Sequence, residues 1–246
     1  MEVILAKTAG FCYGVERAVE LAKRTAAEGG CVMLGSIIHN AAVVQELEAL
    51  GARTVEDVSQ IQPGETVVIR SHGEPVETYR ALEEKGARIV DATCPNVARI
   101  HQLVAKAEEE GRTPLIIGEA HHPEVLAAAS RSPHSVILEG PEELEKWLAA
   151  RPERREMPLL AVAQTTCIQT TWRNAQKILK KECTNAEIFD TICLATHKRQ
   201  TEAAELAAKV DVMVVVGDRK SANTKHLTEI SRMRCPTVYQ IEGAEG

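Results

Sequence analysis

The stretch IVDATCPNVARI, residues 89–100, places a cysteine between a β-branched run and a helical pattern. The run before Cys94 predicts the end of a strand, and Val97 and Ile100 recur at helical spacing after Pro95. Proline suits the first position of a helix, because its missing N–H would have no partner there. The free amides of that turn and the positive end of the helix dipole favour a thiolate, so Cys94 is a candidate ligand. If Cys94 is considered without the rest of the chain, the preferred interpretation is a small hydrophobic residue buried at the end of a strand.

Apolar runs alternate with helical segments along the chain. Helices are expected at 13–29 and 195–210, where apolar residues recur at helical spacing among charged ones. Strands are expected at 2–6, 31–36, 66–71, 87–92, 114–119, 135–140, 159–164, 186–191, 211–217 and 237–241. Alternation of this kind predicts an α/β fold with largely parallel sheets.

Length and composition limit the possible classes of protein. The 246 residues, 44% of them hydrophobic, can bury a sizeable core. The formal net charge is −6 and 3% of the residues are aromatic, which argues against a basic, base-stacking nucleic-acid surface. The first residues lack the pattern of a signal peptide, and no apolar run reaches the length of a membrane span. We therefore expect a soluble cytoplasmic protein that binds neither nucleic acid nor membranes.

The chain has seven cysteines, an odd number, and they are scattered in a way that does not resemble a secreted disulfide framework. The sequence contains no C-x-x-C pair, so it does not indicate a zinc ribbon or a redox dithiol. Cys12 and Cys193, like Cys94, each follow an expected strand and precede a helix. In open α/β folds this edge of the sheet carries the functional site. Three α/β units around a pseudo-threefold axis would each point one cysteine at the centre. Three thiolates leave one position of a metal site open for substrate chemistry.

Eight ordered segments extend this pattern over nearly the whole chain. They are AGFCYGVERAV (9–19), GSIIHN (35–40), RSHGE (70–74), DATCPNV (91–97), HHPEV (121–125), AQTT (163–166), ICLATHKRQ (192–200) and KSANT (220–224). The series resembles the motifs of the 4-hydroxy-3-methylbut-2-enyl diphosphate reductase family of the non-mevalonate isoprenoid pathway. The resemblance implies three α/β domains around a central [4Fe-4S] cluster held by Cys12, Cys94 and Cys193. We expect the domains at residues 1–95, 96–192 and 193–246, the third incomplete relative to the family.

The resemblance also implies which residues bind the diphosphate of the substrate. Imidazole N–H groups and helix N-termini can donate hydrogen bonds to phosphate oxygens. The implied substrate-binding residues are His39, His72, His122, Thr165, Thr166, Ser221, Ala222 and Asn223. Without the resemblance, His39 and His72 would be interpreted as structural, and Ser221 as a helix cap. The family carries Ser-Ser-Asn at 221–223, so Ala222 removes one hydroxyl group from that series.

Glu124 and Thr165 are the implied catalytic residues. By itself, Glu124 is an ordinary first-turn acid after Pro123, and Thr165 is a strand former or a helix cap. Loss of an allylic hydroxyl group as water requires a proton, which a carboxylic acid in a closed pocket can supply. The resemblance gives that role to Glu124, hydrogen-bonded to Thr165.

The implied activity is the reductive dehydroxylation of 4-hydroxy-3-methylbut-2-enyl diphosphate to isopentenyl and dimethylallyl diphosphate. No G-x-G-x-x-G nucleotide fingerprint is present, so the electrons are expected to come from a partner. The resemblance implies ferredoxin or flavodoxin as this donor, and a monomer or weak dimer is expected. Two alternatives remain open. A different three-cysteine iron-sulfur enzyme, of the quinolinate synthase kind, would explain the cysteines but not the HPE and QTT motifs. A truncated non-catalytic relative that binds a cluster would explain Ala222 and the incomplete third unit.

Overall fold

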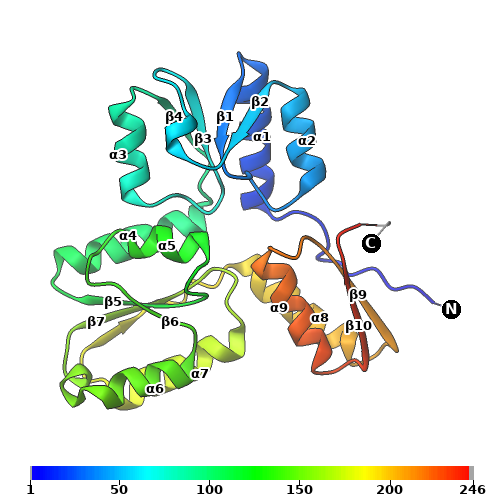
Figure 1. Cartoon of the computed structure of the whole chain (residues 1–246). Helices are drawn as coiled ribbons and strands as arrows, with labels where there is room; N and C mark the ends of the chain where they lie inside the picture. The colour runs from blue at the N-terminus through cyan, green and yellow to red at the C-terminus, as the bar shows by residue number, and fades with distance from the viewer. Residues whose placement is uncertain (1, 244–246) are drawn as a thin grey trace.

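The computed structural model describes residues 2–243 and contains three separate β-sheets. The strand orders are β2-β1-β3-β4, β6-β5-β7-β8 and β10-β9, and every strand pairing in these sheets is parallel. Figure 1 shows each sheet with its own helices, the three groups lying around a common central region. The predicted α/β fold with mostly parallel sheets is confirmed, while the pseudo-threefold axis and the domain boundaries stay predictions.

The first sheet is covered by helices on both faces. Met33 and Val68 pack on one face with Ala18 of the first helix, while Val32 and Val67 point to the other face. This alternation follows from the two-residue repeat of a strand. The elements are α1 (Tyr13–Ala27), β1 (Cys31–Leu34), α2 (Ala41–Ala49), β2 (Ala52–Val55), a 3₁₀ turn (Val58–Gln60), β3 (Thr66–Ile69), α3 (Val76–Glu84) and β4 (Arg88–Asp91).

The second sheet is also covered on both faces, and all five residues of β7 are buried. Leu159 packs with Trp172 on one face, and Leu160 packs with Ile100 on the other. A strand enclosed in this way is apolar at every position. The elements are α4 (Pro95–Glu109), β5 (Thr113–Ile117), α5 (Pro123–Ala129), β6 (Val136–Leu138), α6 (Pro141–Ala150), a 3₁₀ turn (Pro152–Arg155), β7 (Leu159–Ala163), α7 (Gln169–Glu182) and β8 (Ala186–Ile188).

The third sheet has two strands and a largely exposed face. Its elements are α8 (Leu194–Ala207), β9 (Val212–Val216), α9 (Ala222–Arg232) and β10 (Thr237–Ile241). Val214 is 52% exposed and Val216 is 64% exposed, whereas Val215, which points to the opposite face, is buried. Tyr239 lies beside Val214 in the register and is also exposed. The helices of this unit therefore cover one face of its sheet.

One predicted strand is absent from the structure, and one observed strand was not predicted. Residues 2–6 form no strand, because they pair with no strand of the described chain, and Val3 and Leu5 are each 82% exposed. Cys12 therefore begins a helix without following a strand. The missed strand is β2, whose four residues include a single β-branched apolar side chain.

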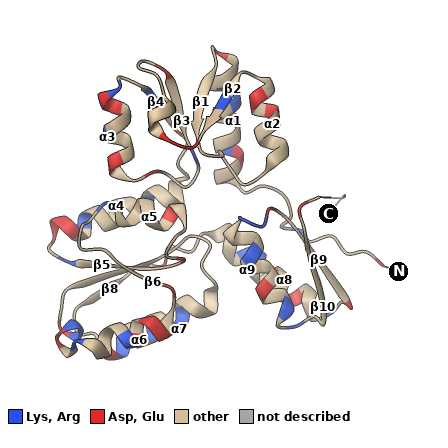
Figure 2. Cartoon of the chain, viewed as in Figure 1, with Lys and Arg blue, Asp and Glu red and all other residues tan. Residues whose placement is uncertain are grey.

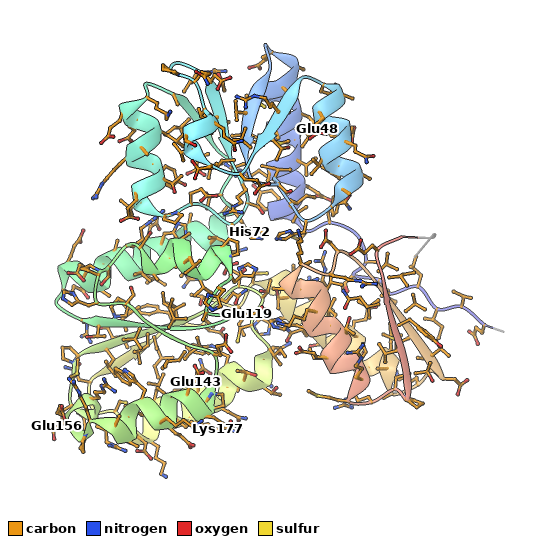
Figure 3. The ribbon with its side chains drawn as sticks, in the orientation of Figure 1. Glu48, His72, Glu119, Glu143, Glu156 and Lys177 are labelled. Carbon is orange, nitrogen blue, oxygen red and sulfur yellow. The ribbon has the colours of Figure 1, made fainter. Side chains whose placement is uncertain are left out.

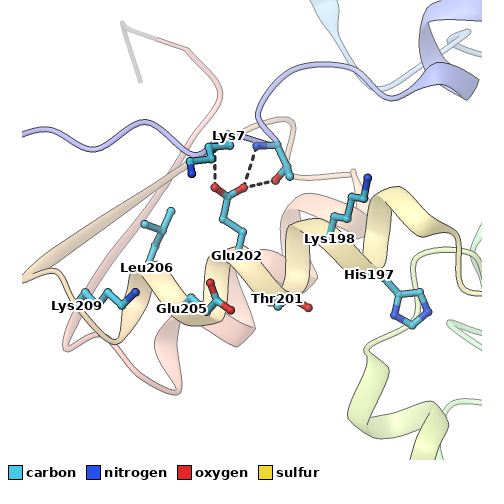
Figure 4. Close-up of a pocket in the computed structure, with 9 residues that line it drawn as sticks. Lys7, His197, Lys198, Thr201, Glu202, Glu205, Leu206 and Lys209 are labelled. Atoms are coloured by element: carbon cyan, nitrogen blue, oxygen red, sulfur yellow. Dashed lines mark hydrogen bonds between the residues drawn. The ribbon is translucent and has the colours of Figure 1, made fainter.

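The segment before Cys12 is held by α8 instead of by a sheet. Glu202 accepts hydrogen bonds from the backbone N–H of Lys7 at 2.7 Å and of Thr8 at 2.9 Å, as Figure 4 shows. Arg199 donates to the carbonyl oxygen of Gly10 at 2.6 Å. The beginning of the described chain is thus attached to the third group of elements.

Charged side chains of both signs occur on the helices of all three sheets (Figure 2). No helix within residues 2–243 combines the length and the apolar composition needed to cross a membrane.

Candidate active site

Each of the three predicted cluster ligands lies directly before a helix. Cys12 precedes α1, Cys94 precedes α4 with Pro95 in the first turn, and Cys193 precedes α8. The sulfur of Cys193 accepts a hydrogen bond from the backbone N–H of Thr196 at 3.4 Å. The amides of such first turns and the helix dipole stabilise negative charge on sulfur.

The structure brings these three cysteines together from three distant parts of the chain. Burial raises the pKa of Cys94, the amides of the following turn lower it, and the nearby thiols of Cys12 and Cys193 raise it further. Gly14 lies against these thiols, because a Cβ atom there would be 2.5 Å from Sγ of Cys94 and 4.0 Å from Sγ of Cys12. A larger residue at this position would collide with the Cys94 thiol unless that side chain moved.

Within residues 2–243, no three His, Cys, Asp or Glu side chains converge closely enough to hold a single metal ion. The cysteines of an iron-sulfur cluster satisfy a different requirement, because each binds its own iron atom.

The three predicted diphosphate-binding histidines form a contiguous row. The ring centroids of His39 and His72 are 5.4 Å apart, and those of His72 and His122 are 5.2 Å apart. Figure 3 shows His72 between the first and second groups of elements. His72 Nδ1 is buried without a hydrogen-bond partner, which marks it as a group available to a ligand.

Burial keeps these imidazoles neutral. It lowers the pKa of His122 to about 4 and, together with the neighbouring His122 and His39, holds the pKa of His72 well below its usual value. Burial also lowers the pKa of His39. A neutral imidazole carries one N–H donor, so the row can donate hydrogen bonds to phosphate oxygens.

Glu124 and Thr165 form a buried hydrogen-bonded pair. Glu124 is 2% exposed, and its carboxyl group accepts hydrogen bonds from Thr165 N at 2.6 Å and from Thr165 Oγ1 at 2.8 Å. Burial raises the pKa of Glu124 to about 7, although the bonds from Thr165 lower it. A carboxyl group with this pKa is protonated in a large fraction of molecules at neutral pH and can act as an acid.

Backbone hydrogen bonds tie the cysteines to these polar groups. Cys94 N donates to the carbonyl oxygen of Ser71 at 2.9 Å, directly beside His72. Cys193 N donates to the carbonyl oxygen of Thr165 at 3.1 Å. The thiols, the histidine row and the Glu124–Thr165 pair therefore lie in one continuous region.

The predicted residues of the third unit lie at the start of α9. Ser221 caps this helix by accepting a hydrogen bond from Thr224 N at 3.4 Å, Ala222 is buried, and Asn223 is half-buried. Asp218 and Lys220, just before them, are near enough to His39 to alter its pKa. This places the start of α9 on the same side as the histidine row.

Two neighbouring side chains have other surroundings. The hydroxyl group of Thr166 accepts a hydrogen bond from Gln164 Nε2 at 3.0 Å, within its own loop. His121 is exposed, whereas the adjacent His122 is buried. Of these two consecutive histidines, His122 therefore lies inside the protein and His121 faces solvent.

Sequence reasoning missed Arg70, which lies next to the histidine row. Its positive charge lowers the pKa of His39, His72 and His122. Its Nε atom forms an ion pair with Oε1 of the buried Glu74 at 2.6 Å. Its position in the RSHGE segment, two residues before His72, was a signal that could have identified it.

The chain is similar to known proteins over nearly its whole length. A sequence model of the family described as LytB protein matches residues 3–246. The chain is 36% identical to the 4-hydroxy-3-methylbut-2-enyl diphosphate reductase of Caldanaerobacter subterraneus subsp. tengcongensis, over 100% of this chain and 85% of the relative. It is 40% identical to the reductase of the same name from Geobacter sulfurreducens, with the same coverage.

Two solved structures are also similar. The E-1-hydroxy-2-methyl-but-2-enyl-4-diphosphate reductase from Plasmodium falciparum matches with a TM-score of 0.89 at 27% identity, over 96% of this chain and 74% of that chain. A structure of (E)-4-hydroxy-3-methyl-but-2-enyl diphosphate reductase, described as the terminal enzyme of the non-mevalonate pathway, matches with a TM-score of 0.71 at 35% identity. That match covers 99% of this chain and 86% of the other.

Proposed function

The chain belongs to the LytB protein family, and from that premise we propose that it reductively removes the hydroxyl group of 4-hydroxy-3-methylbut-2-enyl diphosphate. The products would be isopentenyl and dimethylallyl diphosphate, and the protein would be an iron-sulfur oxidoreductase of the non-mevalonate pathway. The observation that carries this proposal is the buried Glu124–Thr165 pair, whose carboxyl group has a pKa of about 7. It is a proton source beside a group of phosphate-binding side chains.

Cys12, Cys94 and Cys193 fit a three-cysteine [4Fe-4S] cluster. Their thiols lie near one another at three helix N-termini, and Gly14 leaves open the space that a side chain would fill. When bound, the cluster supplies electrons one at a time and an iron atom without a cysteine ligand, which can act as a Lewis acid.

The diphosphate would bind between the histidine row and the start of α9. The neutral imidazoles of His39, His72 and His122 donate hydrogen bonds, and Arg70 supplies a positive charge behind them. The first amides of α9 are free of intrahelical partners and add donors beside Ser221 and Asn223. Ala222 can contribute only its backbone N–H, and Thr166 would complete the wall of the pocket.

Glu124 would hold the proton that leaves with the substrate hydroxyl group as water. Its burial keeps the neutral acid populated, and its two hydrogen bonds to Thr165 fix the orientation of the carboxyl group. Thr165 Oγ1 can contact the same substrate oxygen. The enclosure of the pair excludes bulk water, so the proton is delivered from a defined atom.

The proposal includes the partners and the compartment. Electrons would come from ferredoxin or flavodoxin, and the protein would act in the cytoplasm as a monomer or weak dimer, without nucleic acid or membrane.

The test is anaerobic oxidation of reduced methyl viologen by the iron-reconstituted chain, with and without 4-hydroxy-3-methylbut-2-enyl diphosphate. Substrate-dependent oxidation that forms the two isoprenoid diphosphates is the expected result. The matched control is Cys94→Ala, which should lose bound iron and activity together. No oxidation by a sample with a full complement of iron and sulfide would overturn the proposal in favour of a non-catalytic relative.

A further inference from the structure

A buried histidine outside the groups described above links α9 to the second sheet. His226 is 8% exposed, and its Nδ1 atom lies 2.7 Å from the carbonyl oxygen of Thr166. Its Nε2 atom lies 3.3 Å from Oε1 of Glu119, in the connection between β5 and α5. The Nδ1 atom faces a carbonyl oxygen, which can only accept, so it carries the proton of this hydrogen bond.

Glu119 contacts two consecutive side chains of α9. Lys225 Nζ lies 3.1 Å from Oε2 of Glu119, while the ring of His226 approaches Oε1. Oε1 is buried and makes no hydrogen bond of good geometry, and its contact with Nε2 is an ion pair when both ring nitrogens carry protons. Figure 3 shows Glu119 where the second group of elements meets α9.

Gln164 connects the two segments of the second unit that contact α9. Its side chain is 1% exposed, accepts a hydrogen bond from Glu119 N at 3.0 Å and donates to Thr166 Oγ1 at 3.0 Å. Gly118 permits the close approach, because a Cβ atom there would lie 2.8 Å from the Gln164 side chain. The two loops of the second sheet are therefore fixed to each other, and His226 joins α9 to both.

We propose that Glu119 and His226 are positioning residues, which hold the start of α9 against two connections of the second unit: the one that leads from β5 to Glu124 at the start of α5, and the one after β7 that carries Thr165. The inference rests on the proposed function and deepens it. Glu119 lies three residues before His122, and Asn223 lies three residues before His226 on the same helix. The pair therefore sets the distance between His122 and Asn223, which lie on opposite sides of the proposed diphosphate site.

The contact has little to do with whether α9 folds. Helix α9 also packs against α8, β9 and β10, which hold it in its own unit. Loss of the pair should loosen the junction between units while each unit stays folded. The expected signature is weaker substrate binding with the chemical step retained.

The kinetic test compares His226→Gln, His226→Ala, Glu119→Gln and the double variant Glu119→Gln/His226→Ala as iron-reconstituted enzymes. We expect KM to rise about 10-fold for Glu119→Gln and His226→Ala, with kcat changed less than about 3-fold. His226→Gln keeps a hydrogen-bond donor for the carbonyl oxygen of Thr166, so its KM should rise less. The double variant should be little worse than either single variant. Additive losses, or a fall confined to kcat, would overturn the inference.

The matched control is Glu182→Gln. Glu182 is about as exposed as Glu119, and its ion pair with Arg155 spans 3.0 Å but lies wholly on the second unit. This variant should leave KM unchanged.

A second readout does not depend on turnover. Binding of inorganic diphosphate, measured by calorimetry, should weaken by a similar factor in Glu119→Gln, and amide hydrogen exchange should accelerate at residues 221–226 but not in β5 or β7. If the wild-type chain proves inactive, the proposed function fails while these measurements still decide the positioning role. Unchanged diphosphate binding and exchange in both single variants would overturn it.

Discussion

The second and third sheets contain strands that look alike in sequence and differ in their surroundings. LLAVA in β7 and VMVVV in β9 are both continuous apolar runs. Every residue of β7 is buried between two layers of helices, whereas Val212 and Val214 are about half exposed. A continuous apolar pattern therefore predicts a strand, but it does not say how many layers cover the sheet.

The same difference runs through the candidate site. Glu124 and Thr165 come from the doubly covered second sheet and are buried with their hydrogen bonds complete. Ser221 and Asn223 come from the third unit and are only half-buried at the start of a helix. We infer that the part of the candidate site on the second unit is rigid and that the part at the start of α9 is easier to displace.

The largest expected effect sharpens this contrast. Glu124→Gln keeps the shape of the side chain but removes the acidic proton, so kcat should fall by about 10²- to 10⁴-fold. Ser221→Ala removes one cap and one polar contact, and kcat/KM should fall by about 10-fold. Anaerobic kinetics on samples of equal iron content compares them. An equal loss in both variants would contradict the separate roles proposed for Glu124 and Ser221.

Core truncations test the sheets themselves. Leu160→Ala in β7 opens a cavity in a doubly covered strand and should lower the free energy of unfolding by about 2 to 5 kcal/mol. Val214→Ala in β9 removes a side chain that is 52% exposed and should cost less than about 1 kcal/mol. Urea denaturation measures both. A large loss of unfolding free energy for Val214→Ala would show that this face of the sheet is covered in solution.

The pH dependence of stability should have opposite signs in the two regions. The raised pKa of Glu124 means that the folded state binds its proton more tightly, so stability falls as pH rises from about 4.5 through about 7, by on the order of 3 kcal/mol. Hydrogen bonds from Thr8 and Lys7 lower the pKa of Glu202 on α8, so its contribution is present above its usual pKa and is lost in acid.

Urea midpoints between pH 3 and pH 8 check these signs. Glu124→Gln should flatten the profile between pH 5 and pH 8, and Glu202→Gln should flatten it only at the acid end. A Glu124→Gln profile parallel to that of the wild type would contradict the raised pKa.

The smallest expected effect concerns Ala222. The first amides of α9 are oriented for an anion without any side chain, so Ala222→Ser should change the affinity for inorganic diphosphate by less than about 3-fold. Calorimetry on the iron-reconstituted protein measures it. A gain of 10-fold or more would show that a hydroxyl group at this position makes a contact that the chain lacks.

Much of the fold could be predicted because local patterns determine it. Pro95 after Cys94 marked the start of α4, and the apolar runs marked most strands. Residues 2–6 have the same apolar pattern, but a strand also needs a neighbouring edge, which their sequence does not reveal. Strand β2 was missed because a short edge strand with mixed burial has little apolar signal.

The site could be predicted only in part. The positions of Cys12, Cys94 and Cys193 before helices follow from local sequence, and their roles stay predictions. The contact between Lys225 and Glu119 joins residues 106 positions apart. Such a contact depends on how separate sheets pack, so neither residue carries a local signal for it.

The bonds between Thr8 and Glu202 also bear on the order in which the chain can be completed at the ribosome. The two residues are 194 positions apart, so at about 5 to 20 residues per second Thr8 waits roughly 10 to 40 s for its partner. During that interval the first sheet can fold, but the thiol of Cys12 has no fixed distance to that of Cys193. Because synthesis runs from the N-terminus, the approach of Cys12 to Cys193 is delayed until α8 has been made.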